Sequence, residues 1–197
     1  MPVTVEMIKE LRELTGAGVL DCKDALESAS GDMNHAQQIL REKGLARVAR
    51  RAERVANEGL VEGYVHMGKV GALVELNCET DFVARTPDFK ELAHDLAMQV
   101  VGANPQYIRP EDIPPEVLEN EKQDYQAEMA HLNKPANVLK NIVENKLQQF
   151  YAEVCILNQP FIKDESKTVQ DLINEKISTT GENIVLRRFV RMELSET

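Results

Sequence analysis

The chain has 197 residues, a net charge of −10 at pH 7 and 5% aromatic residues with no tryptophan. This composition argues against a general nucleic-acid binder, because phosphate binding needs clustered cations and stacking rings. The three cysteines lie far apart in the sequence, so they indicate neither a zinc site nor a disulfide framework. With no signal-like start and no run of about 20 apolar residues, we expect a cytoplasmic protein that does not enter a membrane.

The residue pattern of the amino-terminal region predicts three short helices. The first begins after Thr4 and stops at the Gly16 and Gly18 loop, where positive backbone angles would favour glycine. The second covers about residues 19–29, and the third covers 32–43 and ends at Gly44. The bundle resembles the ubiquitin-associated fold, whose glycine-bearing first loop contacts partners. The loop is interpreted either as a partner-binding loop or as a tight turn.

Residues 45–57 form a basic helix or linker that carries Arg47, Arg50, Arg51 and Arg54. Such a run usually faces solvent, and contact with an acidic partner or with RNA is the alternative. We place a domain boundary near Asn57. Residues 1–57 then form the bundle with its basic linker helix, and residues 58–197 form a core domain.

The core predicts an α+β fold with a three-stranded antiparallel sheet, packing helices and a helical hairpin. Alternating apolar residues indicate a β-hairpin over 59–66 and 70–78, and the β-forming segment 183–194 supplies the third strand. Helical periodicity or capping residues predict helices over 87–102, 116–132, 135–154 and 168–179. A break at Asn133-Lys134-Pro135 separates the two helices of the hairpin.

A polar and aromatic corner, Glu79-Thr80-Asp81-Phe82-Val83, separates the second strand from the helix that follows it. In one interpretation Thr80 or Asp81 caps a helical turn while Phe82 folds into the core. In the other, Asp81 and Phe82 form a wedge that enters a phosphate and magnesium site on another protein.

No set of residues suited to covalent catalysis stands out, and we expect neither a metal nor a cofactor. Cys78 lies on the apolar face of its strand, where burial raises a thiol pKa and blocks access. Glu75, Glu79 and Asp81 could flank a cation only if the chain keeps its strand alternation. The histidines lack metal-ligand spacing; they are His35, His66, His94 and His131.

Three segments carry a family resemblance: Leu11-Arg-Glu-Leu-Thr-Gly-Ala-Gly18, Glu75-Leu-Asn-Cys-Glu-Thr-Asp-Phe-Val-Ala-Arg85 and Gln159-Pro-Phe-Ile-Lys-Asp164. In this order and at these separations they resemble translation elongation factor Ts. The resemblance implies a guanine-nucleotide exchange factor that binds the GDP form of elongation factor Tu and promotes GDP release without covalent catalysis. It also favours the wedge interpretation of the corner.

The resemblance further implies two groups of partner-binding residues. The corner residues Thr80, Asp81, Phe82 and Val83 would insert near the magnesium site of elongation factor Tu. The bundle would dock on its nucleotide domain through Leu11, Arg12, Thr15, Gly16, Ala17 and Val19.

The chain departs from longer family members because it carries a single core half. Short members can form homodimers, and we expect the strand segment 187–191 to supply that interface. The alternative function is an RNA- or ribosome-associated module that uses the arginines between Arg47 and Arg54. Steep salt dependence would favour that alternative.

Overall fold

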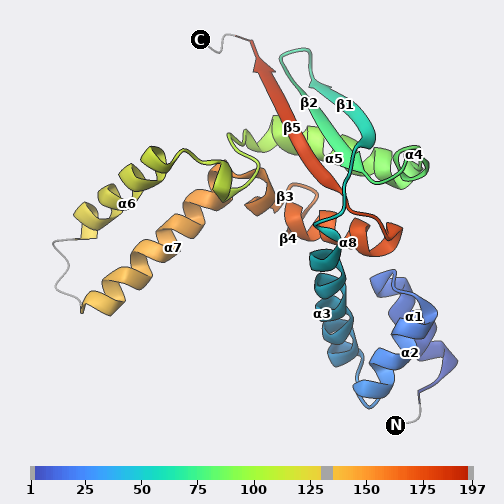
Figure 1. Ribbon diagram of the computed structural model, residues 1–197. Helices are drawn as coiled ribbons and strands as arrows, with labels where there is room; N and C mark the ends of the chain where they lie inside the picture. Colours follow the sequence, from blue (N-terminus) through green and yellow to red (C-terminus); the bar gives the residue numbers. More distant parts are fainter. Residues whose placement is uncertain (1–2, 130–134, 195–197) are drawn as a thin grey trace. The chain divides into compact units, whose positions relative to one another are not determined.

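The computed structural model describes residues 3–129 and 135–194, and its fold is α+β as predicted (Figure 1). The chain divides into two compact units, each assembled from separate stretches. The first contains Met1–Gly59, Asn77–Phe89 and Ile173–Val185, and the second contains Leu60–Leu76, Lys90–Leu172 and Leu186–Thr197. The domain boundary near Asn57 stays a prediction.

Three packed helices open the first unit: α1 (Val5–Thr15), α2 (Val19–Ser28) and α3 (Met33–Arg51). The Thr4 hydroxyl caps α1 and the Asp32 carboxylate caps α3, each by accepting a backbone N–H of the first turn. The bundle core is made of small and medium apolar side chains, chiefly Leu11, Cys22, Ala25, Leu26 and Ala36. The predicted bundle is therefore present.

Two details of the bundle prediction are wrong. The third helix does not end at Gly44 but continues to Arg51. A Cβ at Gly44 would lie 3.3 Å from the Ser178 hydroxyl, so glycine here permits a close approach inside the helix. Gly16 ends α1 with φ at 66°, as expected, whereas Gly18 has φ at −62° and needs no glycine for its backbone angles.

The sheet has the order β1-β2-β5, formed by Glu58–His66, Val70–Cys78 and Val185–Glu193. Met67 and Gly68 both have positive φ in the β1-β2 turn, and the Lys69 N–H donates to the His66 carbonyl over 3.0 Å. This geometry matches the right-handed twist of a two-residue hairpin. At the other edge the Leu194 N–H donates to Lys69 and Arg188 pairs with Glu75, so β5 runs antiparallel to β2.

Helix α5 (Pro87–Ala103) covers one face of the sheet (Figure 1). Its residues Leu92, Leu96 and Val100 are buried, as are Val74 and Leu76 on β2. The apolar face of β2 and the apolar face of α5, which the sequence patterns predict, therefore face one another across a shared core.

The second unit also contains the helical hairpin, formed by α6 (Pro115–Met129) and α7 (Ala136–Val154). The predicted last turn of the first of these helices and its break at Asn133-Lys134 lie outside the described residues. Short 3₁₀ turns flank the hairpin at Pro110–Asp112 and Ile156–Asn158. Among the described residues, no helix has both the length and the apolar character to cross a membrane.

Two short strands were not predicted, β3 (Pro160–Phe161) and β4 (Asp164–Thr168). They are too short to show a periodicity in the sequence. Helix α8 (Val169–Thr180) follows as predicted, with a reciprocal cap in which the Asp171 N–H donates to the Thr168 hydroxyl and the Asp171 carboxylate accepts the Thr168 N–H.

Candidate partner-binding site

The corner forms a single helical turn, α4 (Asp81–Ala84), between β2 and α5. Thr80 is its N-cap, and the Thr80 hydroxyl accepts the Val83 N–H over 3.5 Å. Ala84 is buried, whereas Asp81 and Val83 are partly exposed. The turn is thus anchored through its cap and its last residue.

Phe82 faces solvent, with 81% of its surface exposed. The interpretation in which Phe82 folds into the core is therefore wrong, although the same interpretation correctly predicted the Thr80 cap. The neighbouring Asp81 carboxylate lies 2.6 Å from the Arg85 guanidinium and stays about half exposed, at 47% for its side chain. The turn presents an aromatic ring beside an accessible carboxylate.

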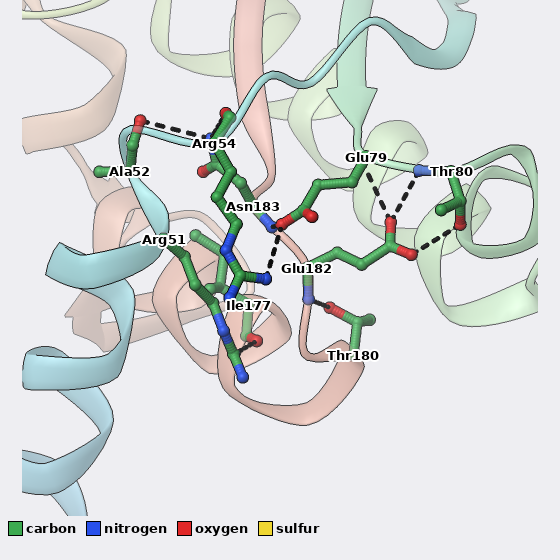
Figure 2. Close-up of polar contacts among 9 residues, drawn as sticks. All are labelled: Arg51, Ala52, Arg54, Glu79, Thr80, Ile177, Thr180, Glu182 and Asn183. Atoms are coloured by element: carbon green, nitrogen blue, oxygen red, sulfur yellow. Dashed lines mark hydrogen bonds and ion pairs between the residues drawn. The ribbon is translucent and has the colours of Figure 1, made fainter.

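The corner is held by a carboxylate from the loop that follows α8 (Figure 2). One Glu182 oxygen accepts the backbone N–H groups of Glu79 at 3.1 Å and Thr80 at 3.0 Å, and the other accepts the Thr80 hydroxyl at 2.6 Å. In return the Glu79 carboxylate accepts the Asn183 N–H at 2.7 Å. We call Glu79, Thr80, Glu182 and Asn183 the clasp.

The clasp also contacts residues of the basic segment 45–57 that follow the end of α3. The buried Asn183 amide donates to the Arg54 carbonyl at 2.8 Å and to the Ala52 carbonyl at 3.5 Å, and the Arg54 guanidinium lies 3.6 Å from the Glu79 carboxylate (Figure 2). Arg51 donates to the Ile177 carbonyl at 2.8 Å. The clasp therefore joins three chain segments of the first unit.

Arg47 also has an internal partner. Its guanidinium donates to both oxygens of Asp21, at 2.7 and 3.1 Å. This fork hydrogen bond lowers the pKa of the Asp21 carboxyl below its usual value and raises that of Arg47. The predicted basic segment thus contributes Arg47, Arg51 and Arg54 to contacts within the protein.

Cys78 is fully buried, as predicted, and its sulfur lies 3.1 Å from the Thr80 carbonyl. Burial, together with the nearby Glu182 charge, raises the pKa of the Cys78 thiol to about 11. A thiol in this setting is a poor nucleophile at neutral pH. Among the described residues, no group of three or more His, Cys, Asp or Glu side chains could hold a metal.

The predicted bundle residues lie around the end of α1 but differ in exposure. Leu11 is fully buried, and its carbonyl accepts the Thr15 hydroxyl at 2.6 Å. Arg12, Gly16 and Val19 are exposed, while Thr15 and Ala17 are half-buried. Two exposed apolar side chains beside them were not predicted from the sequence, Leu14 at 62% and Leu20 at 70%. Their lack of burial partners in the bundle is visible only in the structure.

The third motif has a structural role in the second unit. The buried Gln159 amide donates to the carbonyls of Glu153 at 2.8 Å and Ala103 at 3.3 Å, and its oxygen accepts from Gln99 at 3.1 Å. Gln99 also donates to the Pro160 carbonyl and accepts the Ile162 N–H. These bonds fix the β3 region to α5.

A family model described as Elongation factor TS matches residues 19–196. The chain belongs to the elongation factor Ts family. It is 56% identical to Elongation factor Ts of Carboxydothermus hydrogenoformans, over 98% of this chain and 90% of that protein. It is 53% identical to Elongation factor Ts of Thermodesulfovibrio yellowstonii, over 100% and 98% of the two chains.

Elongation factor Ts of Coprothermobacter proteolyticus is 51% identical over the whole length of both chains. Family membership makes the protein an elongation factor of translation and confirms the resemblance carried by the three motifs.

Proposed function

We propose that the protein is the guanine-nucleotide exchange factor of elongation factor Tu. It binds the GDP form, disturbs the magnesium and phosphate site through Asp81 and Phe82, and promotes GDP release so that GTP can bind. Family membership supports the general role. The single observation that carries the mechanism is the exposed Phe82 ring on a capped turn, beside a carboxylate.

The physical logic is a coupling between two binding events. An exchange factor that binds elongation factor Tu more tightly when nucleotide is absent lowers the affinity of elongation factor Tu for nucleotide. Bound nucleotide lowers the affinity for the exchange factor by the same ratio. Because Phe82 is exposed in the free protein, burying its ring in a partner supplies binding free energy of about 1.5–3 kcal/mol. Asp81 places a negative charge where it can compete for a metal ion or its ligands.

The bundle supplies the second contact surface in this proposal. Val19, Leu14 and Leu20 present apolar area beside Arg12 and the Gly16 loop, a mixture typical of protein interfaces. Leu11 contributes through the bundle core because its side chain is buried. Thr15 and Ala17 complete the rim of the loop.

We also propose a homodimer. The face of the sheet turned away from α5 carries exposed apolar residues from all three strands, including Val65, Leu73, Val190 and Met192. A shallow groove of about 360 Å³ runs over β1, β2 and β5 on this side. A second copy would cover this face, in agreement with the interface expected at residues 187–191.

The proposed activity needs no covalent catalysis and no direct contact with nucleic acid, and it would take place in the cytoplasm with the translation machinery. Arg47, Arg51 and Arg54 have internal partners, which leaves the RNA-binding alternative without a specific supporting observation.

The test is release of a fluorescent GDP analogue from elongation factor Tu at fixed magnesium. We expect the wild-type protein to accelerate GDP release. Phe82→Ala should reduce this acceleration about 10- to 100-fold, which corresponds to the free energy of burying one ring. Met67→Ala is a matched control, because Met67 is equally exposed, at 82%, but lies in the β-hairpin turn. No acceleration by folded wild-type protein would refute the proposal.

A further inference from the structure

We propose that Glu182 is the positioning residue of the corner, and that the segment 177–183 couples the corner to the bundle. This inference rests on the proposed exchange function. It assigns to Glu182 the task of holding the Phe82 turn in the orientation that enters the partner.

The directions of the hydrogen bonds at Thr80 show how Glu182 acts on the cap. The Thr80 hydroxyl donates its hydrogen to Glu182 over 2.6 Å, which leaves an oxygen lone pair for the Val83 N–H. Glu182 therefore fixes the orientation of the Thr80 hydroxyl as well as accepting its hydrogen. The backbone N–H groups of Glu79 and Thr80, which precede the turn, also donate to this carboxylate.

The turn that carries Phe82 is too short to fix its own orientation. Helix α4 spans only Asp81–Ala84, and a single turn does not persist without external contacts. Phe82 cannot supply them, because its ring is exposed. The orientation of the ring thus depends on the cap and on the groups that fix the cap.

A path of contacts within the first unit connects the corner to the bundle. Glu182 follows α8, and a Cβ at Gly16 would lie 3.4 Å from the Thr179 methyl group. Arg51 donates to the Ile177 carbonyl, and Asn183 donates to the carbonyls at the end of the basic segment. The loop proposed to dock and the turn proposed to insert therefore contact the same segment.

The test compares Glu182→Gln with wild type in the GDP-release assay. Glutamine keeps the size of the side chain but replaces one acceptor oxygen with a donor, so it cannot accept from the Thr80 hydroxyl and from the Glu79 and Thr80 N–H groups at once, and the clasp is weakened. We expect the release rate at saturating factor to fall about tenfold while the half-saturating concentration stays within about twofold, since the docking surface is retained. Glu116→Gln, an exposed change on α6, is the matched control and should leave both quantities unchanged.

A double variant separates positioning from general loss of structure. If Glu182 acts through the ring, adding Phe82→Ala to Glu182→Gln lowers the rate by much less than Phe82→Ala does alone. Independent, additive losses would overturn the inference. So would a wild-type saturating rate in Glu182→Gln.

Hydrogen exchange of the free protein supplies a readout that does not involve elongation factor Tu. Glu182→Gln should speed exchange of the Glu79 and Thr80 amides by about tenfold and leave the amides of the bundle core unchanged. Unchanged exchange at both amides would overturn the inference even if the wild-type protein accelerates GDP release from elongation factor Tu. If the wild-type protein does not accelerate GDP release, the exchange proposal itself fails and the inference falls with it.

Discussion

The buried amide network of Gln99 gives a stability prediction that can be worked from the structure. The Gln99 side chain is completely buried; its nitrogen donates to Gln159 and to the Pro160 carbonyl, both at 3.1 Å, and its oxygen accepts the Ile162 N–H at 2.9 Å. Gln99→Leu removes these three bonds while nearly conserving the volume. Each polar group left unpaired in a buried site costs about 1–3 kcal/mol.

Two effects make the expected loss of stability smaller than the summed cost of the three unpaired groups. Pro160 and Ile162 are exposed residues, so their unpaired groups lie closer to solvent than Gln159 does, and the new leucine gains some apolar transfer free energy. We therefore expect Gln99→Leu to lower the free energy of unfolding by about 2–4 kcal/mol. For a chain of this size the melting temperature falls by about 5–15 °C.

The assay is urea and thermal unfolding followed by circular dichroism, with Gln123→Leu as control. Gln123 is exposed on α6 and bonds to Glu119 at 3.2 Å, so its replacement should change the free energy of unfolding by less than about 0.5 kcal/mol. If Gln99→Leu is as stable as the control, the network contributes nothing net and the reasoning is refuted.

Three further predictions concern other parts of the chain. Asp21→Asn should lower the free energy of unfolding by about 0.5–1 kcal/mol at pH 7. Pairing with Arg47 lowers the Asp21 pKa, so the stability difference between wild type and Asp21→Asn should disappear as pH falls through about 4 and below. Unfolding curves measured from pH 7 to pH 2.5 test this. A stability difference that stays constant over this range would contradict the prediction. Val190→Asp should convert a dimer into a monomer in sedimentation, since it places a charge on the exposed sheet face; an unchanged mass would remove that face as the interface. With a thiol pKa of about 11, Cys78 should resist iodoacetamide in the native protein at pH 8 and react after unfolding, as read by peptide mass spectrometry; fast native labelling would contradict its burial.

The elements set by local chemistry could be predicted from the sequence. The alternation along β2 specifies which residues face α5, and Met67-Gly68 supplies the two positive φ angles of the hairpin turn. Thr168 and Asp171 lie three residues apart and form the expected cap of α8. In each case the interacting groups are close in the sequence.

Features that depend on distant neighbours were predicted less well. Gly44 has the sequence character of a helix stop, yet the approach of Ser178 explains a glycine inside a continuous helix. The corner composition is compatible with a buried or an exposed Phe82, because the choice depends on how much apolar surface the rest of the fold leaves uncovered. The family resemblance favours the exposed alternative, and the structure places the ring in solvent.

The clasp shows why a motif can indicate a functional corner without indicating what holds it. A capping hydroxyl that accepts a backbone N–H still has its own hydrogen to donate, so a half-buried Thr80 requires an acceptor. That acceptor is 102 residues away in the sequence, at Glu182. The chain contains 33 acidic residues, and nothing local to Gly181-Glu182-Asn183 distinguishes this carboxylate from the others. The capping role of Thr80 follows from the sequence, whereas its half-burial and the identity of its acceptor follow only from the folded chain.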